Sequence, residues 1–263
     1  MKAGFYQFDV IFGKKEDNLG KVAAALRDAD ADLIVLPEFF ATGYQFATQE
    51  EVVDLAEPVP VGMTTDFLIE QSRQRGIYLV AGLPERDGEA FFNSAVLTGP
   101  DGFIGLYRKT HLFSREKLFF APGDTGFRVW ETEIGRIGVM ICFDWFFPES
   151  MRTLALRGAE VIAHPSNLVL PYCPQAMPTR CLENRVFAVT ANRTGTEART
   201  ADETLTFIGQ SQITSPKAEV IVRAPGDGAS LLIAEIDPSI ARNKALNPLN
   251  DLFADRRPDL YER

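Results

Sequence analysis

Three side chains of complementary chemistry each follow a run of residues that is predicted to form a buried strand. Glu38 comes shortly after residues 33–36, Lys109 directly after residues 103–108, and Cys142 directly after residues 136–141. In open α/β folds, ligands bind beyond the carboxyl ends of strands, where loops can be shaped while the sheet stays rigid. A carboxylate, an ammonium and a thiol at such an edge are the groups that nucleophilic hydrolysis needs.

Cys142 is the candidate nucleophile. An ordinary thiol has a pKa of about 8.5, so only a few per cent is ionised at neutral pH. A neighbouring ammonium or a helix start favours the thiolate, and a carboxylate can accept its proton directly. The expected strand, turn and helix around Cys142 resemble a nucleophile elbow without its flanking glycines. Taken alone, Cys142 also fits a small buried hydrophobe, which is how we interpret Cys173 and Cys181.

The neighbours of Glu38 and Lys109 indicate their roles. Pro37, Phe39 and Phe40 flank Glu38, and burial among apolar groups raises the pKa of a carboxyl toward the range of a general base. The alternative, an exposed loop glutamate, fits this aromatic flank less well. Lys109 would supply a fixed positive charge where an oxyanion develops, although a lone lysine is more commonly solvated.

A cysteine–histidine mechanism is the alternative that the residues leave open. His111 and His164 are the only histidines, and His164 follows the apolar run 161–163. His164 therefore reaches the same predicted edge as Cys142, where it would serve as the base. On the residues alone, Glu38 and His164 stay competing candidates.

Composition and charge set the class of protein. The chain has 263 residues, 46% of them hydrophobic, and a formal charge of −9, which fits a globular protein with a large core. The charge and the lack of a basic run argue against nucleic acid and anionic membranes as partners. Three cysteines without close Cys or His partners predict neither disulfides nor a metal site. The sequence lacks a signal-peptide pattern and a spanning apolar stretch, so we expect a cytoplasmic location.

Apolar runs of strand length alternate with helical patterns, which predicts an α/β fold. Helices are expected over residues 17–29, 64–75, 148–157 and 175–185. Strands are expected over residues 3–10, 33–36, 77–83, 93–98, 103–108, 136–141, 160–163, 186–190, 207–214, 219–223 and 231–236. Thr64 or Thr65 is the expected cap of the second helix and Gly76 its end, and residues 99–102 predict a hairpin turn. Without a repeat or a linker, we expect one domain over residues 1–263.

Three segments together resemble the nitrilase-like carbon–nitrogen hydrolase family. They are residues 36–40 (LPEFF), 108–113 (RKTHLF) and 142–149 (CFDWFFPE). In this order and spacing they are highly specific, and similarity at residues 93–95, 121–124, 164–167 and 180–192 extends the resemblance over most of the chain. It implies an α-β-β-α sandwich, assembled as a homodimer or a higher oligomer through helices and the C-terminal tail, here about residues 238–263.

The resemblance also implies a catalytic triad of Glu38, Lys109 and Cys142, joined by a second glutamate that matches Glu116, seven residues beyond Lys109. In the implied reaction, Glu38 accepts the thiol proton and Cys142 attacks an amide carbonyl. Lys109 and the main-chain N–H of Phe143 bind the oxyanion, while Glu116 orients Lys109 and the substrate. Glu38 protonates the departing ammonia, which leaves a thioester on Cys142, and water activated by Glu38 then hydrolyses the thioester. This chemistry requires no cofactor and no metal, and it gives both histidines structural roles.

The residues after the nucleophile bear on the substrate. Cys142-Phe143-Asp144 is closer to amidases of the family than to its nitrilases, in which Cys-Trp-Glu is common. Many of these amidases have an arginine four residues beyond the cysteine, where this chain has Phe146. Because arginine is the natural clamp for a carboxylate, its absence favours small, uncharged aliphatic amides. The alternative is that Phe146 belongs to the core and another cation, such as Arg180, serves the pocket.

Three other functions stay open: nitrile hydrolysis, N-carbamoyl amide hydrolysis, and binding without catalysis. Against the last, a silent protein has no physical need of a buried charge cluster. The expected partner is therefore a small amide or nitrile. The side chains expected to line the pocket, besides Phe143, are Tyr44, Phe113, Trp145, Phe146 and Asn167.

Overall fold

Two six-stranded sheets form the centre of the computed structural model, which describes residues 1–261. The first contains β1 (Lys2–Gln7), β2 (Leu33–Val35), β3 (Tyr78–Asp87), β4 (Ala90–Gly99), β5 (Gly102–Arg108) and β14 (Ser230–Glu235). The second contains β6 (Val129–Thr132), β7 (Gly135–Val139), β8 (Val161–Pro165), β9 (Phe187–Ala191), β12 (Gln212–Thr214) and β13 (Val220–Arg223). Two small pairs join β10 (Thr196–Glu197) to β11 (Leu205–Thr206) and β15 (Ala245–Asn247) to β16 (Asn250–Asp251).

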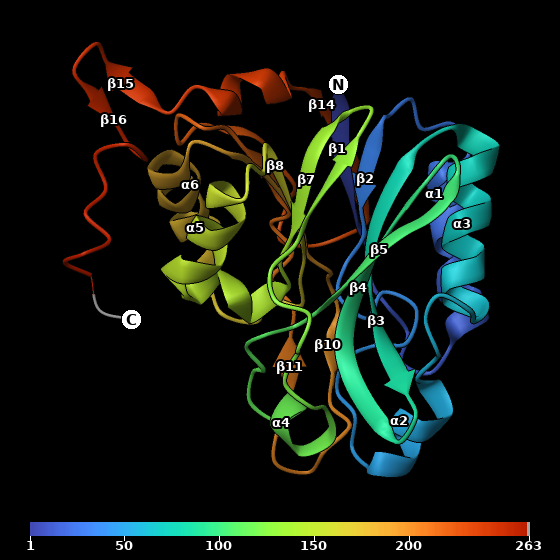
Figure 1. Cartoon of the computed structure of the whole chain (residues 1–263). Helices are drawn as coiled ribbons and strands as arrows, with labels where there is room; N and C mark the ends of the chain where they lie inside the picture. Colours follow the sequence, from blue (N-terminus) through green and yellow to red (C-terminus); the bar gives the residue numbers. More distant parts are fainter. Residues whose placement is uncertain (262–263) are drawn as a thin grey trace.

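Helices cover the outer faces of both sheets (Figure 1). The helices of residues 1–261 are α1 (Lys15–Leu26), α2 (Gln49–Leu55), α3 (Met63–Arg75), α4 (Glu116–Phe119), α5 (Pro148–Leu156) and α6 (Cys173–Asn184), with 3₁₀ turns η1 (Cys142–Phe146) and η2 (Pro238–Arg242). Of these, α2 and α4 lie beyond the strand ends rather than over a sheet (Figure 1). α1 and α3 lie against the first sheet, and α5 and α6 lie against the second. The predicted α-β-β-α sandwich is confirmed.

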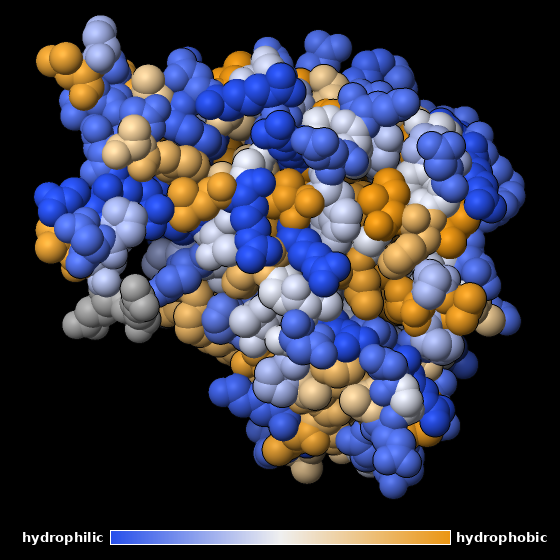
Figure 2. All heavy atoms as spheres, viewed as in Figure 1, coloured by the Kyte–Doolittle hydropathy of each residue, from blue (hydrophilic) through white to orange (hydrophobic). Residues whose placement is uncertain are grey.

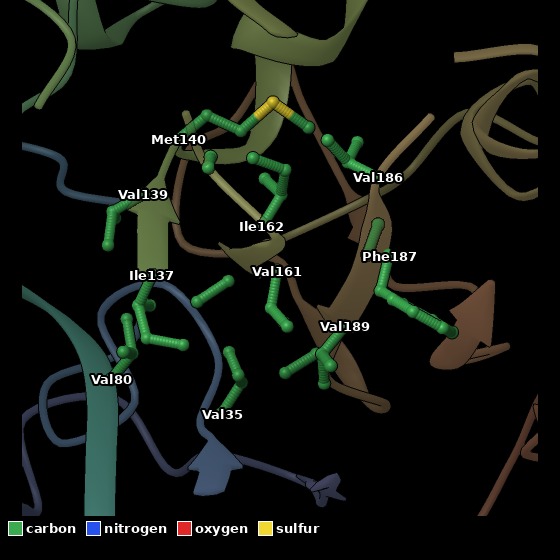
Figure 3. Packing of buried hydrophobic residues seen from close by; sticks show 14 of the residues in the cluster. Val35, Val80, Ile137, Val139, Met140, Val161, Ile162, Val186, Phe187 and Val189 are labelled. Carbon is green, nitrogen blue, oxygen red and sulfur yellow. The ribbon is translucent and has the colours of Figure 1, made fainter. Parts of the chain in front are cut away.

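Successive side chains of a strand belong to different hydrophobic clusters, one between the two sheets and one between a sheet and its helices. In β2, Leu33 and Val35 belong to the cluster between the sheets, whereas Ile34 belongs to the cluster under α1 and α3. This follows from the period of two, which points successive side chains to opposite faces of a sheet. Figure 3 shows Val35 of the first sheet facing Val161 and other aliphatic side chains of the second. Such close packing holds the two sheets, and the strand ends that they carry, in one fixed arrangement.

The central strands of each sheet run parallel, and two of them end just before a candidate residue. The order of the first sheet is β14-β1-β2-β3-β4-β5, and that of the second is β13-β12-β9-β8-β7-β6. β1, β2 and β3 are mutually parallel, as are β7, β8 and β9. Glu38 follows the end of β2 and Cys142 follows the end of β7, while Lys109 follows the antiparallel strand β5. All three residues thus leave their sheets at strand ends, as predicted.

Two local predictions are wrong for identifiable reasons. The expected strand 207–214 is paired only at Gln212–Thr214, because Gly209 and Gln210 have φ values of +58° and +55°, which end an extended run. Thr64 and Thr65 lie within α3 rather than before it. The cap comes from outside the helix, where the Glu57 carboxylate accepts the Thr64 N–H at 2.7 Å. Gly76 does end α3, with φ of +67°.

The surface of the molecule and its C-terminal tail lie outside these layers. On the face seen in Figure 2, hydrophilic and hydrophobic side chains are interspersed. No helix within residues 1–261 has the length and apolar character needed to cross a membrane. The tail, for which the sequence predicted little periodicity, contains η2 and the β15–β16 pair. The last two residues of the predicted tail segment, 262 and 263, lie outside the described part of the chain.

Candidate active site

A buried cluster of charged side chains lies between the two sheets' strand ends. Lys109 Nζ donates to Glu38 Oε1 at 2.7 Å and to both carboxylate oxygens of Glu116, at 2.7 and 2.9 Å. Asn93 Nδ2 donates to Glu38 Oε1 at 2.7 Å and to Glu116 Oε2 at 3.3 Å. All four residues are buried. Hydrogen bonds therefore join three of the four predicted catalytic residues, and they add Asn93, for which the sequence offered only a place in a motif.

Glu38 has one engaged and one unengaged carboxylate oxygen. Its Oε2 is buried and has no hydrogen-bond partner among the described residues. Burial raises the pKa of Glu38 to about 7, opposed by the nearby charge of Lys109 and assisted by that of Glu116. Burial therefore outweighs the charge of Lys109, which by itself would lower the pKa of Glu38. A carboxyl that titrates near neutrality, with a free oxygen, is suited to move protons.

Lys109 keeps its proton in spite of its burial. Burial alone would lower its pKa, but the negative charges of Glu116 and Glu38 outweigh that effect and raise it above its ordinary value. Glu116 is itself held by the Tyr44 hydroxyl, which donates to Oε1 at 2.6 Å, and by the Phe113 main-chain N–H at 3.3 Å. Lys109 is therefore a permanent, fixed cation, as a group that stabilises an oxyanion must be.

The chain turns sharply where it presents Glu38. Phe39 has a φ of +50°, rare for a residue with a side chain. A Cβ on Gly82 of β3 would lie 2.6 Å from the Glu38 Cα, so only glycine allows this approach. Asn167 Nδ2 completes the turn by donating to the Glu38 carbonyl oxygen at 2.9 Å. The strain is local and is supported by contacts from both sheets.

Cys142 occupies a similarly strained turn. Its φ is +41°, immediately after the extended residue Ile141 and at the start of η1. The backbone thus has the sharp turn between a strand and a helical segment that the sequence predicted, and it forms this turn without glycine. Burial and the negative charge of Glu38 raise the pKa of Cys142 well above its usual value, although Lys109 and the Asn167 main-chain N–H act in the opposite direction. The resting thiol is therefore protonated, and it needs a base to become a nucleophile.

Asp144 supports this turn and was missed as a functional residue. Its Oδ2 accepts the Ile141 N–H at 2.9 Å and the Tyr107 hydroxyl at 2.7 Å. Its Oδ1 accepts the main-chain N–H of His111 at 3.1 Å and contacts the His111 ring at 2.8 Å. The available signal was an acidic residue two positions beyond Cys142 in a run of aromatics. A buried carboxylate there requires several donors, and a strained turn supplies them.

The geometry favours Glu38 over His164 as the base. His164 Nε2 lies 3.0 Å from the carbonyl oxygen of Cys142, and Nδ1 lies 3.1 Å from Thr190 Oγ1. Because a carbonyl oxygen only accepts, Nε2 carries the hydrogen and is directed to the main chain rather than to the sulfur. Burial lowers the pKa of His164 to about 4, so the ring is neutral. His111 contacts Asp144 and stacks on Phe147 at 3.7 Å, which also fits a structural role.

Cys142 opens on a small, apolar pocket of about 30 Å³. Its lining contains five of the predicted residues together with three aliphatic ones that the sequence did not single out: Phe113, Phe143, Trp145, Phe146, Asn167, Leu168, Val169 and Leu170. Over residues 1–261, no arginine, lysine or histidine lines it. Arg180 instead donates to the Trp145 carbonyl oxygen at 3.2 Å and to Glu183 at 3.1 Å. Phe146 is 51% exposed, so it lies at the mouth of the pocket and not in the core.

Tyr44 is the predicted lining residue that lies elsewhere. It borders a second cavity, of about 20 Å³, together with Glu116 and Phe113. Phe113 lines both cavities. For the part of the chain that the structure covers, no group of three or more His, Cys, Asp or Glu side chains is arranged to hold a metal ion.

A buried Glu–Lys–Glu cluster beside a cysteine in an elbow, on a four-layer sandwich, defines a class of thiol hydrolases that act on carbon–nitrogen bonds. The chain belongs to the carbon–nitrogen hydrolase family, whose model matches residues 2–245. Its sequence is 52% identical over 266 residues to a protein named nitrilase from Pyrococcus abyssi, and the match covers 100% of each chain.

Solved structures agree with this assignment. The carbon–nitrogen hydrolase of Helicobacter pylori G27 superposes with a TM-score of 0.90 at 26% identity, over 99% of this chain and 97% of that one. The amidase of Nesterenkonia sp. AN1 superposes with a TM-score of 0.82 at 25% identity, over 99% and 95%. In that amidase structure, the acetamide moiety of fluoroacetamide is covalently attached to the active site cysteine.

Proposed function

We propose that this hydrolase cleaves short, uncharged aliphatic carboxamides to a carboxylic acid and ammonia through a thioester on Cys142. The observation that carries the proposal is the buried cluster in which Lys109 is shared by Glu38 and Glu116 beside a protonated thiol. This arrangement supplies a base, a fixed cation and a nucleophile within one dry site.

In the first half of the reaction, Glu38 takes the proton from the Cys142 thiol as the sulfur attacks the amide carbonyl. Lys109 and the main-chain N–H of Phe143 bind the oxygen on which negative charge develops. Glu38 then gives its proton to the nitrogen, and the C–N bond breaks. Ammonia departs, and the acyl group remains on Cys142 as a thioester. In the second half, Glu38 takes a proton from water, hydroxide adds to the thioester, and the thiol departs with that proton. The carboxylic acid is the product.

The pocket supports a small and uncharged acyl group. A volume of about 30 Å³ accommodates two or three water-sized groups, at about 10–15 Å³ each. Its lining is largely aromatic and aliphatic, and over residues 1–261 no arginine, lysine or histidine contributes to it. A substrate carboxylate would thus be buried without a partner, which costs more than an apolar chain does. Short alkyl amides satisfy these conditions better than N-carbamoyl amino acids or monoamides of dicarboxylic acids.

Nitrile hydrolysis is the second candidate, because the relative with 52% identity is named a nitrilase. The same thiol would add to a C≡N carbon, and water would then convert the thioimidate to the thioester with loss of ammonia. To decide, ammonia release is measured from a matched panel: acetamide, propionamide, butyramide, the corresponding nitriles, a succinic monoamide and an N-carbamoyl amino acid. We expect the short amides to be turned over best. Preference for the two anionic substrates would contradict the proposal, and no release at all from folded protein would favour a binding homologue.

The pH dependence tests the role of Glu38. Because the base must be ionised to accept the thiol proton, kcat/KM should rise with pH through a midpoint near the Glu38 pKa of about 7. Below this midpoint, the rate should fall about tenfold for each pH unit. Initial rates on propionamide between pH 5 and 9 measure the profile. A rate that stays flat down to pH 5 would contradict the assignment of Glu38 as base.

Three further features stay predictions: one domain over the whole chain, a cytoplasmic location, and assembly as a homodimer or higher oligomer. For assembly, the tail offers exposed apolar side chains at Leu246, Leu249 and Leu260. Burial of such side chains against a second copy would be favourable.

A further inference from the structure

A buried arginine and glutamate lie next to the active site without any part in the reaction above. Arg193 is 1% exposed, and its guanidinium donates to the carbonyl oxygens of Val10 at 2.6 Å and Thr194 at 3.1 Å. It also lies 4.1 Å from the ring centroid of Phe207 and forms an ion pair with Glu197. Both charged groups come from residues 193–197, which leave the second sheet after β9.

The Glu197 carboxylate contacts a loop of the opposite sheet. It accepts the main-chain N–H of Gln45 at 2.6 Å and that of Tyr44 at 3.2 Å. The preceding Gly43 has a φ of +83°, and a Cβ there would lie 2.9 Å from Glu197 Oε1. In Figure 1, β10, which ends at Glu197, and β11 lie close to α4, which begins at Glu116. Glu197 therefore joins the segment after β9 to the main chain at Tyr44 and Gln45.

Tyr44 connects these contacts to the buried cluster of Glu38, Lys109 and Glu116. Its ring packs edge-on against Phe207 at 6.1 Å, the same ring that Arg193 covers. Its hydroxyl donates to Glu116 Oε1 at 2.6 Å, and Glu116 in turn accepts from Lys109. Burial and the charge of Glu116 raise the pKa of Tyr44 well above its ordinary value, so the hydroxyl keeps its proton and remains a donor.

We propose that Glu197 is a positioning residue for catalysis: paired with Arg193, it holds the Tyr44 main chain so that the Tyr44 hydroxyl stabilises the charge of Glu116. This inference rests on the proposed function of the Glu38–Lys109–Cys142 set. The physical reason is the sharing of one ammonium between two carboxylates. If Glu116 loses the Tyr44 donor, its charge is less stabilised and attracts Lys109 more strongly. Lys109 then serves Glu38 and the developing oxyanion less well.

The alternative is that Glu197 only neutralises a buried arginine. That role would affect folding stability and leave the chemistry of Glu38 unchanged. The two roles differ in their effect on the pH profile. The titratable groups that face Glu38 are Lys109, Glu116, Cys142 and Tyr44. A less stabilised Glu116 charge beside Glu38 raises the pKa of Glu38, so the acid limb of kcat/KM moves to higher pH.

The test compares Glu197→Gln, Tyr44→Phe and the double variant in the full-length protein, with propionamide as substrate. Each single change should lower kcat about 10- to 100-fold, the effect of losing one hydrogen bond to a charged group. Each should also move the acid limb to higher pH. The double variant should be no slower than the slower single variant, because both changes remove the same hydrogen bond. Glu160→Gln is the matched control: Glu160 is also a buried glutamate paired with an arginine, here Arg242, and its change should leave kcat and the acid limb as in the wild type.

Two results would overturn the inference. One is a Glu197→Gln variant with a lower melting temperature but wild-type kcat and acid limb. The other is a double variant whose loss equals the product of the two single losses, which would mean that Glu197 acts by a route other than Tyr44. If Glu197→Gln does not fold, the paired Arg193→Met, Glu197→Leu variant removes both buried charges together and takes its place in the comparison. Wild-type turnover that is lost in Cys142→Ala would uphold the proposed function in either case.

Discussion

Replacing Cys142 by alanine should abolish amide hydrolysis while leaving the protein folded. The sulfur is the only group placed in the elbow to form a thioester, so no covalent route remains. Removal of a nucleophile in comparable hydrolases costs about 10⁴-fold or more, with the residual rate owed to binding and the oxyanion site. Ammonia release from propionamide measures the loss, and circular dichroism checks the fold. Alanine fits, because the change removes one buried sulfur and leaves no charge unpaired.

Cys181→Ala is the matched control for this result. Cys181 is also a free, fully buried cysteine, but it lies in α6 within the core cluster. Its removal should leave turnover near the wild-type value. Mass spectrometry with a haloacetamide should likewise detect an adduct on the wild type and on Cys181→Ala, and none on Cys142→Ala. Turnover within tenfold of wild type in Cys142→Ala would refute the proposed nucleophile.

Replacing Glu38 by glutamine should have the second largest effect. The amide has the shape of the carboxylate but cannot accept a proton, so the thiol loses its base. We expect kcat/KM to fall by about 10²–10⁴, the range typical of general acid–base catalysis. The variant should fold, since Lys109 keeps both of its contacts with Glu116. Initial rates over pH 5 to 9 should also show that the acid limb near 7 has disappeared from the residual activity.

Glu85→Gln is the control for the general effect of removing a buried carboxylate, apart from any role as a base. Glu85 lies in β3 and is buried, and its partner Arg108 retains contacts with Asp87 and Asp124. Activity and the acid limb should be those of the wild type. The role of Glu38 would have to be abandoned if Glu38→Gln kept more than a tenth of the wild-type rate with an unchanged pH profile.

Local patterns predicted most of the elements of the fold. The hairpin of β4 and β5 was predicted from Gly99 and Gly102 around a turn, and the end of α3 from Gly76. The strand 207–214 was overestimated, because the positive φ of Gln210 has no signal in its residue type. The cap of α3 was missed, because it comes from Glu57, seven residues before Thr64. Short-range periodicity therefore predicts the existence of an element better than its ends.

For the active site, the sequence by itself determined which side chains follow strand ends, and family resemblance added Glu116. What it could not supply is the state of those groups. The pKa of Glu38 depends on Lys109, 71 positions away along the chain. The choice of Glu38 over His164 rests on where the Nε2–H of His164 points.

The tertiary structure alone decided how distant segments support the site. Glu197 contacts the main chain of Gln45 across 152 positions of sequence, and Asp144 binds the loop at His111 across 33 positions. Propensity and periodicity depend on neighbours within a few residues, whereas electrostatic effects and hydrogen bonds depend on distance through space. The types of the candidate catalytic residues were therefore evident in the sequence, whereas their protonation, partners and strain depend on how the two sheets pack together.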